Sequence, residues 1–287
     1  MNIENKVLAC VDQSPFADHV CDYAAWAAAR MDAPLELLHV IDRHPEIGNA
    51  DDRSGSLEPN AQEHLLTQLS AQDEILSKNA REQGRVFLNR LRERALAAGV
   101  ASVDVRQRHG HLDETLRDWE PGVRLFVLGR HGQTGTAGGQ DLGSNVERVV
   151  RVLQRPVLTV TEGFKPPQRV LIAFDGSALT RRGVQMVADS PLLHGLPITL
   201  QMAGKLRQHS QREMAWAADA LTATGFEVHR SVRDGEAEKV ILDTIASENI
   251  DLLVMGAYSH ARWRNLLFGS RTDEMLRAVR IPALLLR

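Results

Sequence analysis

The chain has 287 residues, of which 43% are hydrophobic and 25% are charged, and its formal net charge at pH 7 is −3. These values exclude a disordered or collagen-like chain, and the length predicts two domains. The near-neutral charge, together with apolar runs far shorter than the ~20 residues that cross a bilayer, predicts neither a nucleic-acid nor a membrane partner.

The first half starts with an apolar run, Lys6-Val-Leu-Ala-Cys-Val-Asp12, which predicts a buried strand that ends at Asp12. Ser14 suits the N-cap of a following helix, and Pro15 suits its first position. The apolar side chains of this helix recur at helical spacing, at Val20, Ala24, Ala27 and Met31.

Residues 44–83 are rich in Asp, Gly, Ser, Asn and Gln, and we expect an insertion there with a helical part near residues 65–75. A second helix then runs to a stop signal at Gly99, with one apolar face formed by Phe87, Leu91, Ala95 and Ala98. Two further strands are predicted at Leu125-Phe-Val-Leu-Gly129 and at Arg155-Pro-Val-Leu-Thr-Val160.

The second half repeats the landmarks of the first half in the same order. They are Arg169-Val-Leu-Ile-Ala-Phe-Asp175-Gly-Ser177, Leu252-Leu-Val-Met-Gly256, Gly269-Ser270 and Ile281-Pro-Ala-Leu-Leu-Leu286. Asp12 and Gly129 are 117 residues apart, whereas Asp175 and Gly256 are 81 residues apart. The difference of 36 residues places the insertion in the first half.

A linker at Thr161–Gln168, which contains Gly163 and Pro166-Pro167, separates the halves. We therefore place the domains at residues 1–162 and 168–287. Continuous apolar strands that alternate with amphipathic helices indicate parallel strands buried on both faces. The sequence thus predicts an α/β protein with two tandem doubly wound domains.

Asp12 and Asp175 each follow the first strand of a half. Ligands of open parallel sheets bind at the carboxyl ends of strands, where a carboxylate accepts hydrogen bonds from ribose hydroxyls or an adenine amino group. The alternative is that each Asp only caps the helix after it, because Asp is a common turn and cap residue.

Each half also has a glycine loop between a strand and a helix. The first loop runs from Gly129-Arg-His-Gly132 to Gly143-Ser144-Asn145, and the second from Gly256-Ala-Tyr-Ser259 to Gly269-Ser270-Arg271. Glycine lets the backbone approach a phosphate, and the helix N-terminus offers free N–H groups. A tight turn without ligand is the alternative, but two such loops with paired Asp residues favour phosphate binding.

This combination resembles the universal stress protein family in its tandem two-domain form. The family loop has Gly, two residues, Gly, nine residues, and then Gly followed by Ser or Thr. The second half keeps this spacing with Ser259 in place of the middle Gly, whereas the first half has Gly129 and Gly132 but ten residues before Gly143. We slightly favour the second half as the occupied site, since the longer first loop is less predictable.

The resemblance implies five parallel strands in the order 3-2-1-4-5 in each domain. It also implies an intramolecular pseudo-dimer in which the domains pair through their last strands, Val157–Val160 and Ala283–Leu286. In ATP-binding members, the first-strand Asp, a second-strand backbone group and the glycine loop hold the nucleotide. These roles fall on Asp12, Val40, Gly129, Gly132, Gly143 and Ser144 in the first half, and on Asp175, Met202, Gly256, Ser259, Gly269 and Ser270 in the second.

Eleven histidines raise the hypothesis of a metal site, and His109 and His111 are the closest pair. A zinc site needs three or four ligands, and no further ligand joins this pair at motif spacing. We therefore expect no metal beyond Mg²⁺ that accompanies ATP. His131 and His260 lie inside the glycine loops, where they either contact phosphates or are simply exposed.

Neither a GxxxxGK[ST] P-loop nor a GxSxG nucleophile elbow occurs, so we expect no efficient catalysis. Cys10 and Cys21 are too few for a disulfide framework, and no signal-peptide core is visible, which predicts a cytoplasmic protein with reduced thiols. The sequence predicts a stress-response regulator that binds ATP or AMP. The alternatives are an interaction protein with empty pockets and a slow ATPase; a homodimer and a regulatory protein partner fit either class.

Overall fold

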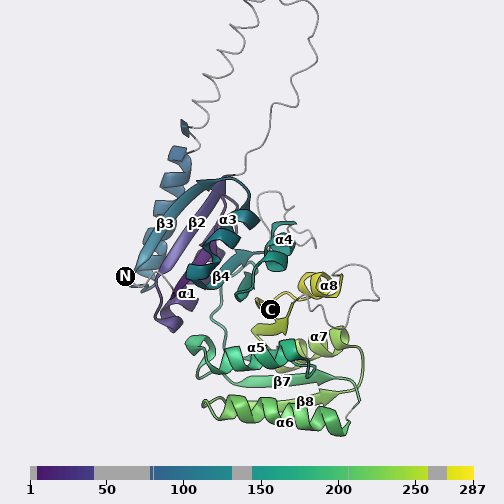
Figure 1. Ribbon diagram of the computed structural model, residues 1–287. Coiled ribbons are helices and arrows are strands. Elements are labelled where there is room, and N and C mark those ends of the chain that lie inside the picture. The colour runs from purple at the N-terminus through teal and green to yellow at the C-terminus, as the bar shows by residue number, and fades with distance from the viewer. Residues whose placement is uncertain (1–4, 42–77, 80, 131–143, 206, 258–269) are drawn as a thin grey trace, which may run out of the picture.

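The computed structural model describes residues 5–41, 78–79, 81–130, 144–205, 207–257 and 270–287 (Figure 1). These residues form ten strands in one continuous sheet, in the order β3-β2-β1-β4-β5-β10-β9-β6-β7-β8. The strands of the first half are β1 (Lys6–Cys10), β2 (Leu35–Ile41), β3 (Val103–His109), β4 (Val123–Gly129) and β5 (Val157–Val160). Those of the second half are β6 (Val170–Ala173), β7 (Ile198–Ala203), β8 (Val228–Arg233), β9 (Leu252–Gly256) and β10 (Ala283–Leu286).

Each half has the strand order that the family resemblance implied. In the first half β1 is central and pairs in parallel with β2 and β4, while β3 and β5 lie outside these two strands. In the second half β6 takes the central place and pairs in parallel with β7 and β9. The predicted class, two tandem doubly wound α/β units, is confirmed.

Helices cover both faces of this sheet. The helices of the first half are α1 (Ala17–Met31), residues 81–97, α3 (Leu112–Trp119) and α4 (Ser144–Val152). Those of the second half are α5 (Ala178–Ala188), α6 (Gln208–Thr222), α7 (Ala237–Glu248) and α8 (Ser270–Ala278). One core packs α1, residues 81–97, α5 and α6 on the sheet, and the other packs α3, α4, α7 and α8. Both cores contain side chains from both halves.

The position of a strand in the sheet explains its sequence pattern. In β4, four consecutive residues from Leu125 to Leu128 are at most 4% exposed, because helices cover both faces of an interior strand. In the edge strand β3, the exposed residues Asp104, Arg106 and Arg108 stand at alternate positions. Charged side chains on an edge strand discourage pairing with other chains.

The predicted start of the first helix is wrong by two residues. α1 begins at Ala17, and its N-cap residue Phe16 makes no side-chain cap hydrogen bond. Ser14 instead forms a tight local turn, in which its hydroxyl oxygen accepts from the Phe16 N–H at 3.3 Å, so Pro15 lies in the turn before the helix. In the second half Ser177 caps α5 through the Thr180 N–H.

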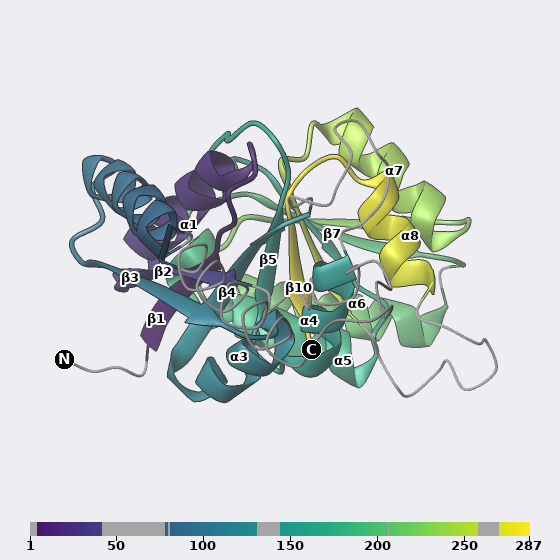
Figure 2. The same cartoon turned by 90° about the horizontal axis from the view of Figure 1, so that it is seen from above.

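The two halves meet where β5 and β10 pair antiparallel, at the middle of the sheet (Figure 2). Leu158 lies opposite Leu284, and both side chains are buried. The Thr159 hydroxyl adds a hydrogen bond to the Ala283 carbonyl at 3.2 Å. The predicted pairing of the last strands is therefore observed.

The linker is fixed to both halves. Phe164 packs edge-to-face on Tyr23 of α1, with ring centroids 4.8 Å apart. At its other end, the Asp251 carboxylate accepts hydrogen bonds from the backbone N–H groups of Gln168 (3.1 Å) and Arg169 (3.2 Å). These contacts hold the linker between the aromatic pair and the start of β9.

The predicted insertion at residues 44–83 falls almost entirely outside the described residues. Of the predicted apolar face of the next helix, Leu91 and Ala95 are fully buried and Phe87 is partly buried. Ala98 is exposed, contrary to the prediction, because the helix ends at residue 97 and Ala98 lies in the turn after it. Gly99 follows this helix with φ +92°, the left-handed conformation of a helix stop. Among the described residues, no helix is long and apolar enough to cross a membrane.

The pairing of β5 with β10 predicts the assembly of the second half when it is expressed alone. Residues 168–287 would expose the apolar edge of β10, and edges of this kind pair with each other. We expect this fragment to dimerise, as measured by light scattering across a concentration series. A fragment that remains a folded monomer at all concentrations would contradict the prediction.

Candidate functional site

Asp12 and Asp175 occupy equivalent places in the two halves. Asp12 lies two residues beyond β1, whose neighbours are β2 and β4, and Asp175 lies two residues beyond β6, whose neighbours are β7 and β9. In a doubly wound sheet this is the point at which the strand order reverses, and a crevice opens there at the carboxyl ends of the strands. The structure therefore brings both predicted carboxylates to the expected ligand edge.

Neither Asp is the N-cap of the helix that follows it. Asp12 is partly buried, and its Oδ1 accepts a hydrogen bond from the Ser14 N–H at 3.1 Å. The residue before Asp12 is held by a buried histidine: His39 donates from Nδ1 to the Val11 carbonyl at 2.9 Å. The Phe87 ring packs on His39 with centroids 5.6 Å apart. Our sequence reasoning missed His39, whose signal is a polar residue within an apolar strand.

The second carboxylate accepts from a backbone N–H and from a side-chain hydroxyl. Asp175 is exposed, and its Oδ1 accepts from the Ser177 N–H and from the Thr180 hydroxyl, both at 2.8 Å. The equivalent of Thr180 in the first half is Ala17, which has no hydroxyl. The two turns therefore present different hydrogen-bonding surroundings to a ligand, and Thr180 is a second residue that our sequence reasoning missed.

The strand register shows that Val40 and Met202, to which the same role was assigned in the two halves, are not at equivalent positions. Ala9 pairs with Leu37 and Ile172 pairs with Leu200, an offset of 28 residues in both halves. Continuing that register places Val40 beside Asp12 and Ala203 beside Asp175. Met202 is instead the equivalent of His39, and its side chain is only 6% exposed within the core.

The glycines that begin the two loops close the neighbouring strands. Gly129 ends β4 and pairs with Val160, and Gly256 ends β9 and pairs with Leu286. A Cβ at Gly256 would lie 2.7 Å from Leu179 Cδ2, so the side chain of Leu179 on α5 packs directly against the backbone of β9 there. A side chain at this position would have to displace the Leu179 side chain, so glycine favours this close packing with or without a ligand.

The remaining loop residues lie mostly outside the described ranges. These are Gly132, Gly143, Ser259 and Gly269, together with His131 and His260. Ser144 and Ser270 are the first residues of α4 and α8. Each loop thus connects a strand end beside Asp12 or Asp175 to a helix N-terminus.

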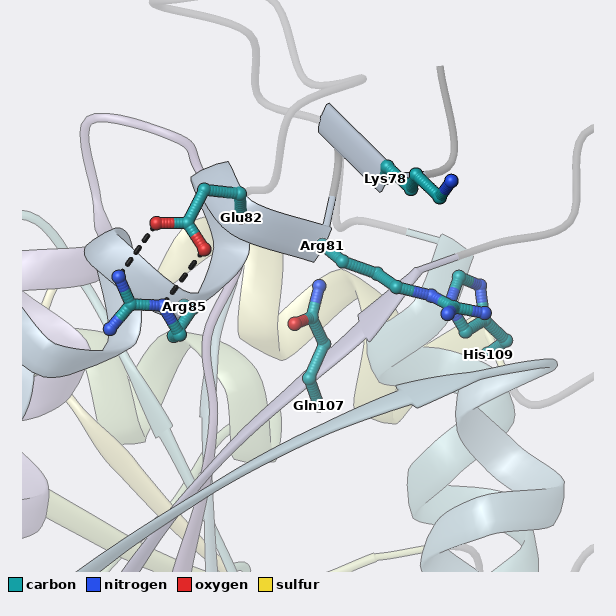
Figure 3. A pocket seen from close by; sticks show the side chains of 6 residues that line it. All are labelled: Lys78, Arg81, Glu82, Arg85, Gln107 and His109. Carbon is teal, nitrogen blue, oxygen red and sulfur yellow. Dashed lines mark hydrogen bonds and ion pairs between the residues drawn. The ribbon is translucent and has the colours of Figure 1, made fainter. Parts of the chain in front are cut away.

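A separate cavity of about 580 Å³ lies between the helix at residues 81–97 and the edge strand β3 (Figure 3). Its lining residues are Lys78, Arg81, Glu82, Arg85, Gln107 and His109. The Glu82 carboxylate accepts two hydrogen bonds from the Arg85 guanidinium, at 2.6 and 2.9 Å. None of the predicted nucleotide residues lines this basic cavity, so it is distinct from the strand-end site.

Among the described residues, no group of three or more His, Cys, Asp or Glu side chains could hold a metal ion. His109 ends β3, whereas His111 precedes α3 on the other side of Gly110.

Both thiols of the chain have a raised pKa. Burial of its sulfur raises the pKa of Cys10, the last residue of β1, well above its usual value. Burial also raises the pKa of Cys21 to about 12, and the Cys21 Sγ donates to the Leu91 carbonyl at 3.3 Å. The thiolate is the reactive form, so these environments suppress thiol chemistry.

The raised pKa values predict that neither thiol of the native protein reacts readily near pH 8. For Cys21, a pKa of about 12 lowers the thiolate fraction on the order of a thousandfold relative to a free thiol. We expect slow labelling by a disulfide reagent in buffer and rapid labelling of two thiols in denaturant. A fast-reacting thiol in the native protein would show that one of these sites is open.

The comparisons with known proteins agree over the whole chain. The model of the universal stress protein family matches residues 4–161 and 167–287. A universal stress protein of Synechocystis sp. is 33% identical over 285 residues, which cover 98% of this chain and 99% of the relative. A second relative, from Mycolicibacterium smegmatis, is 23% identical over 305 residues and is covered over 97% of its length.

The fold has a solved counterpart over its full length. The crystal structure of a universal stress protein from Archaeoglobus fulgidus aligns with a TM-score of 0.70 and 17% identity, covering 98% of both chains. Because the family model matches both halves and a relative of 33% identity spans nearly the whole sequence, this chain belongs to the universal stress protein family.

Proposed function

We propose that this protein is a cytoplasmic stress-response regulator that binds an adenine nucleotide, ATP or AMP, and does not catalyse a reaction efficiently. The binding units would be residues 1–162 and 168–287. The supporting observation is the equivalence of Asp12 and Asp175, each of which lies in a fixed turn at the switch point of its sheet. Duplicate carboxylates at duplicate ligand edges are expected if both halves bind the same class of ligand.

The chemistry of the strand ends fits the parts of a nucleotide. The carboxylates of Asp12 and Asp175 are acceptors for ribose hydroxyls. Backbone groups of Val40, and of Met202 or its neighbour Ala203, are suited to the adenine edge. The phosphates are assigned to the glycine loops and helix N-termini, at Gly129, Gly132, Gly143 and Ser144 and at Gly256, Ser259, Gly269 and Ser270.

The proposal gives the protein no metal site of its own. Mg²⁺ would arrive only with ATP and be held by its phosphates, since carboxylates and phosphates are its preferred ligands. We propose that the nucleotide state is read by a protein partner, or by a second copy of the chain. The competing functions are an interaction protein with empty pockets and a slow ATPase.

Substitutions at the two strand ends test the binding of nucleotide. We expect Gly143→Val or Gly269→Val to abolish binding in its own half by occupying the space of a phosphate. Asp12→Ala or Asp175→Ala should cost about 1–3 kcal/mol, the range for a hydrogen bond to a charged group, or roughly 5- to 150-fold in Kd. Calorimetry with ATP and with AMP measures each effect.

The fifth variant should strengthen nucleotide binding, whereas the other four weaken it. Ser259→Gly restores the middle glycine of the family loop, whose spacing the second half already keeps, and should tighten binding in the second half. Unchanged affinity in all five variants, with the circular dichroism spectrum intact, would remove the proposed site and favour the interaction protein. Phosphate release from ATP over hours tests the slow ATPase.

The hydroxyl of Thr180 predicts a difference between the halves. It donates to the Asp175 Oδ1 that a ribose hydroxyl would also use, so Thr180→Ala should tighten binding in the second half about two- to tenfold. Thr180→Ser keeps the donor and is the matched control. The measurement is calorimetry in the Gly143→Val background, and equal affinities for all three proteins would show that the hydroxyl does not compete.

A further inference from the structure

Arg130 directly follows Gly129, the last residue of β4. Its backbone N–H donates to the Val160 carbonyl at 3.0 Å, which continues the pairing of β4 with β5. Its side chain is only 3% exposed and crosses β5, where Nε donates to the Thr159 hydroxyl at 3.3 Å. The guanidinium therefore points across the junction into the second half.

The guanidinium binds the last turn of α8 and the segment that follows it. It donates to the carbonyl oxygens of Leu276 at 3.0 Å, Val279, and Ile281 at 2.7 Å. The last carbonyls of a helix have no partner within the helix, and they form the negative end of its dipole. Arg130 supplies both the donors and the positive charge that this end of α8 requires.

The charge of Arg130 is balanced mainly by backbone. Burial lowers the pKa of Arg130 to about 10, so the guanidinium remains protonated at neutral pH. Among the described residues, no carboxylate forms a salt bridge with it. Because a buried cation is costly without a partner, the pairing with the end of α8 makes the two halves mutually dependent.

A second arginine makes the reciprocal contact. Arg287 follows β10 in the second half, and its Nη1 donates to the carbonyls of Arg151 and of Leu153, the latter at 3.2 Å. These carbonyls belong to the carboxyl end of α4 in the first half. Each helix that begins at the end of a glycine loop is thus bound at its other end by an arginine from the opposite half.

We propose that Arg130 is a positioning residue for the phosphate site of the second half, and that Arg287 is the positioning residue for that of the first half. This inference rests on the proposed binding of nucleotide. Neither arginine contacts the ligand of the site it serves; each acts through the helix that it holds. Each half would therefore complete the binding site of the other.

The arginine at one end of the helix and the phosphate at the other end both stabilise the helix. α4 and α8 have nine residues each, a length of about 13 Å, and helices this short are marginal without contacts at their ends. A cation at the carboxyl end opposes fraying, and an anion at the amino end interacts favourably with the same dipole. Loss of the arginine would unpair the last carbonyls and loosen the helix whose first N–H groups bind phosphate.

The single-site variants described above allow a crossed test. In the Gly143→Val background only the second half binds, and Arg130→Gln should weaken ATP binding about two- to thirtyfold, the range of a charge at a helix end. In the Gly269→Val background only the first half binds, and Arg287→Gln should have the corresponding effect. Arg287→Gln should leave the affinity of the second half unchanged, whereas a general loss of stability would weaken both halves.

Two controls accompany the calorimetry. Arg117→Gln removes an exposed arginine of α3 and should leave both affinities unchanged. Hydrogen exchange should become faster in α8 for Arg130→Gln and in α4 for Arg287→Gln, with the central strands still protected. If Arg130→Gln impairs folding, Arg130→Lys takes its place in the test. It keeps the charge without the planar set of donors, so its affinity for ATP should lie between that of the unmodified protein and that expected for Arg130→Gln.

The outcomes separate this inference from the proposed function. Nucleotide binding without a crossed effect of Arg130→Gln or Arg287→Gln would overturn the positioning role and leave the proposed function intact. Absence of nucleotide binding in every single-site protein, and in the unmodified chain, would overturn both. A loss confined to the opposite half in each case supports the reciprocal arrangement.

Discussion

The antiparallel pairing of β5 with β10 is the constraint on which the rest of the molecule depends. It joins two parallel sheets into one and lets both cores continue from one half to the other. Without it, each half would present an apolar strand edge to solvent. The same junction brings Arg130 to the end of α8 and Arg287 to the end of α4, so these contacts between the halves exist only because the two strands pair.

The two halves are equivalent in topology but differ in the chemistry of their ligand edges. The turn after β1 is supported by buried His39, whose place in the second half is taken by Met202. The turn after β6 has the additional donor Thr180, where the first half has Ala17. The two halves therefore repeat the positions of the carboxylates in different surroundings.

Much of the fold was predictable because its signals are local. Buried parallel strands require continuous apolar runs, and the repeated order of landmarks exposed the duplication. The predicted helix start at Pro15 was wrong because Ser14 bonds to the N–H two residues on, a choice between two local turns that composition does not reveal. The equivalence of Val40 with Met202 was one residue off, since strand register depends on partners that lie far away in the sequence.

The sequence by itself determined the duplicated α/β architecture, the places of Asp12 and Asp175, and the glycines that close β4 and β9, since each depends on residue type and spacing along the chain. Only the tertiary structure showed what Gly256 packs against, because the contact comes from the Leu179 side chain on α5. It alone decided the role of Arg130, which looks in the sequence like an exposed loop residue. A cation becomes a helix cap only when folding brings open carbonyls of another half within hydrogen-bonding distance and removes water from around it.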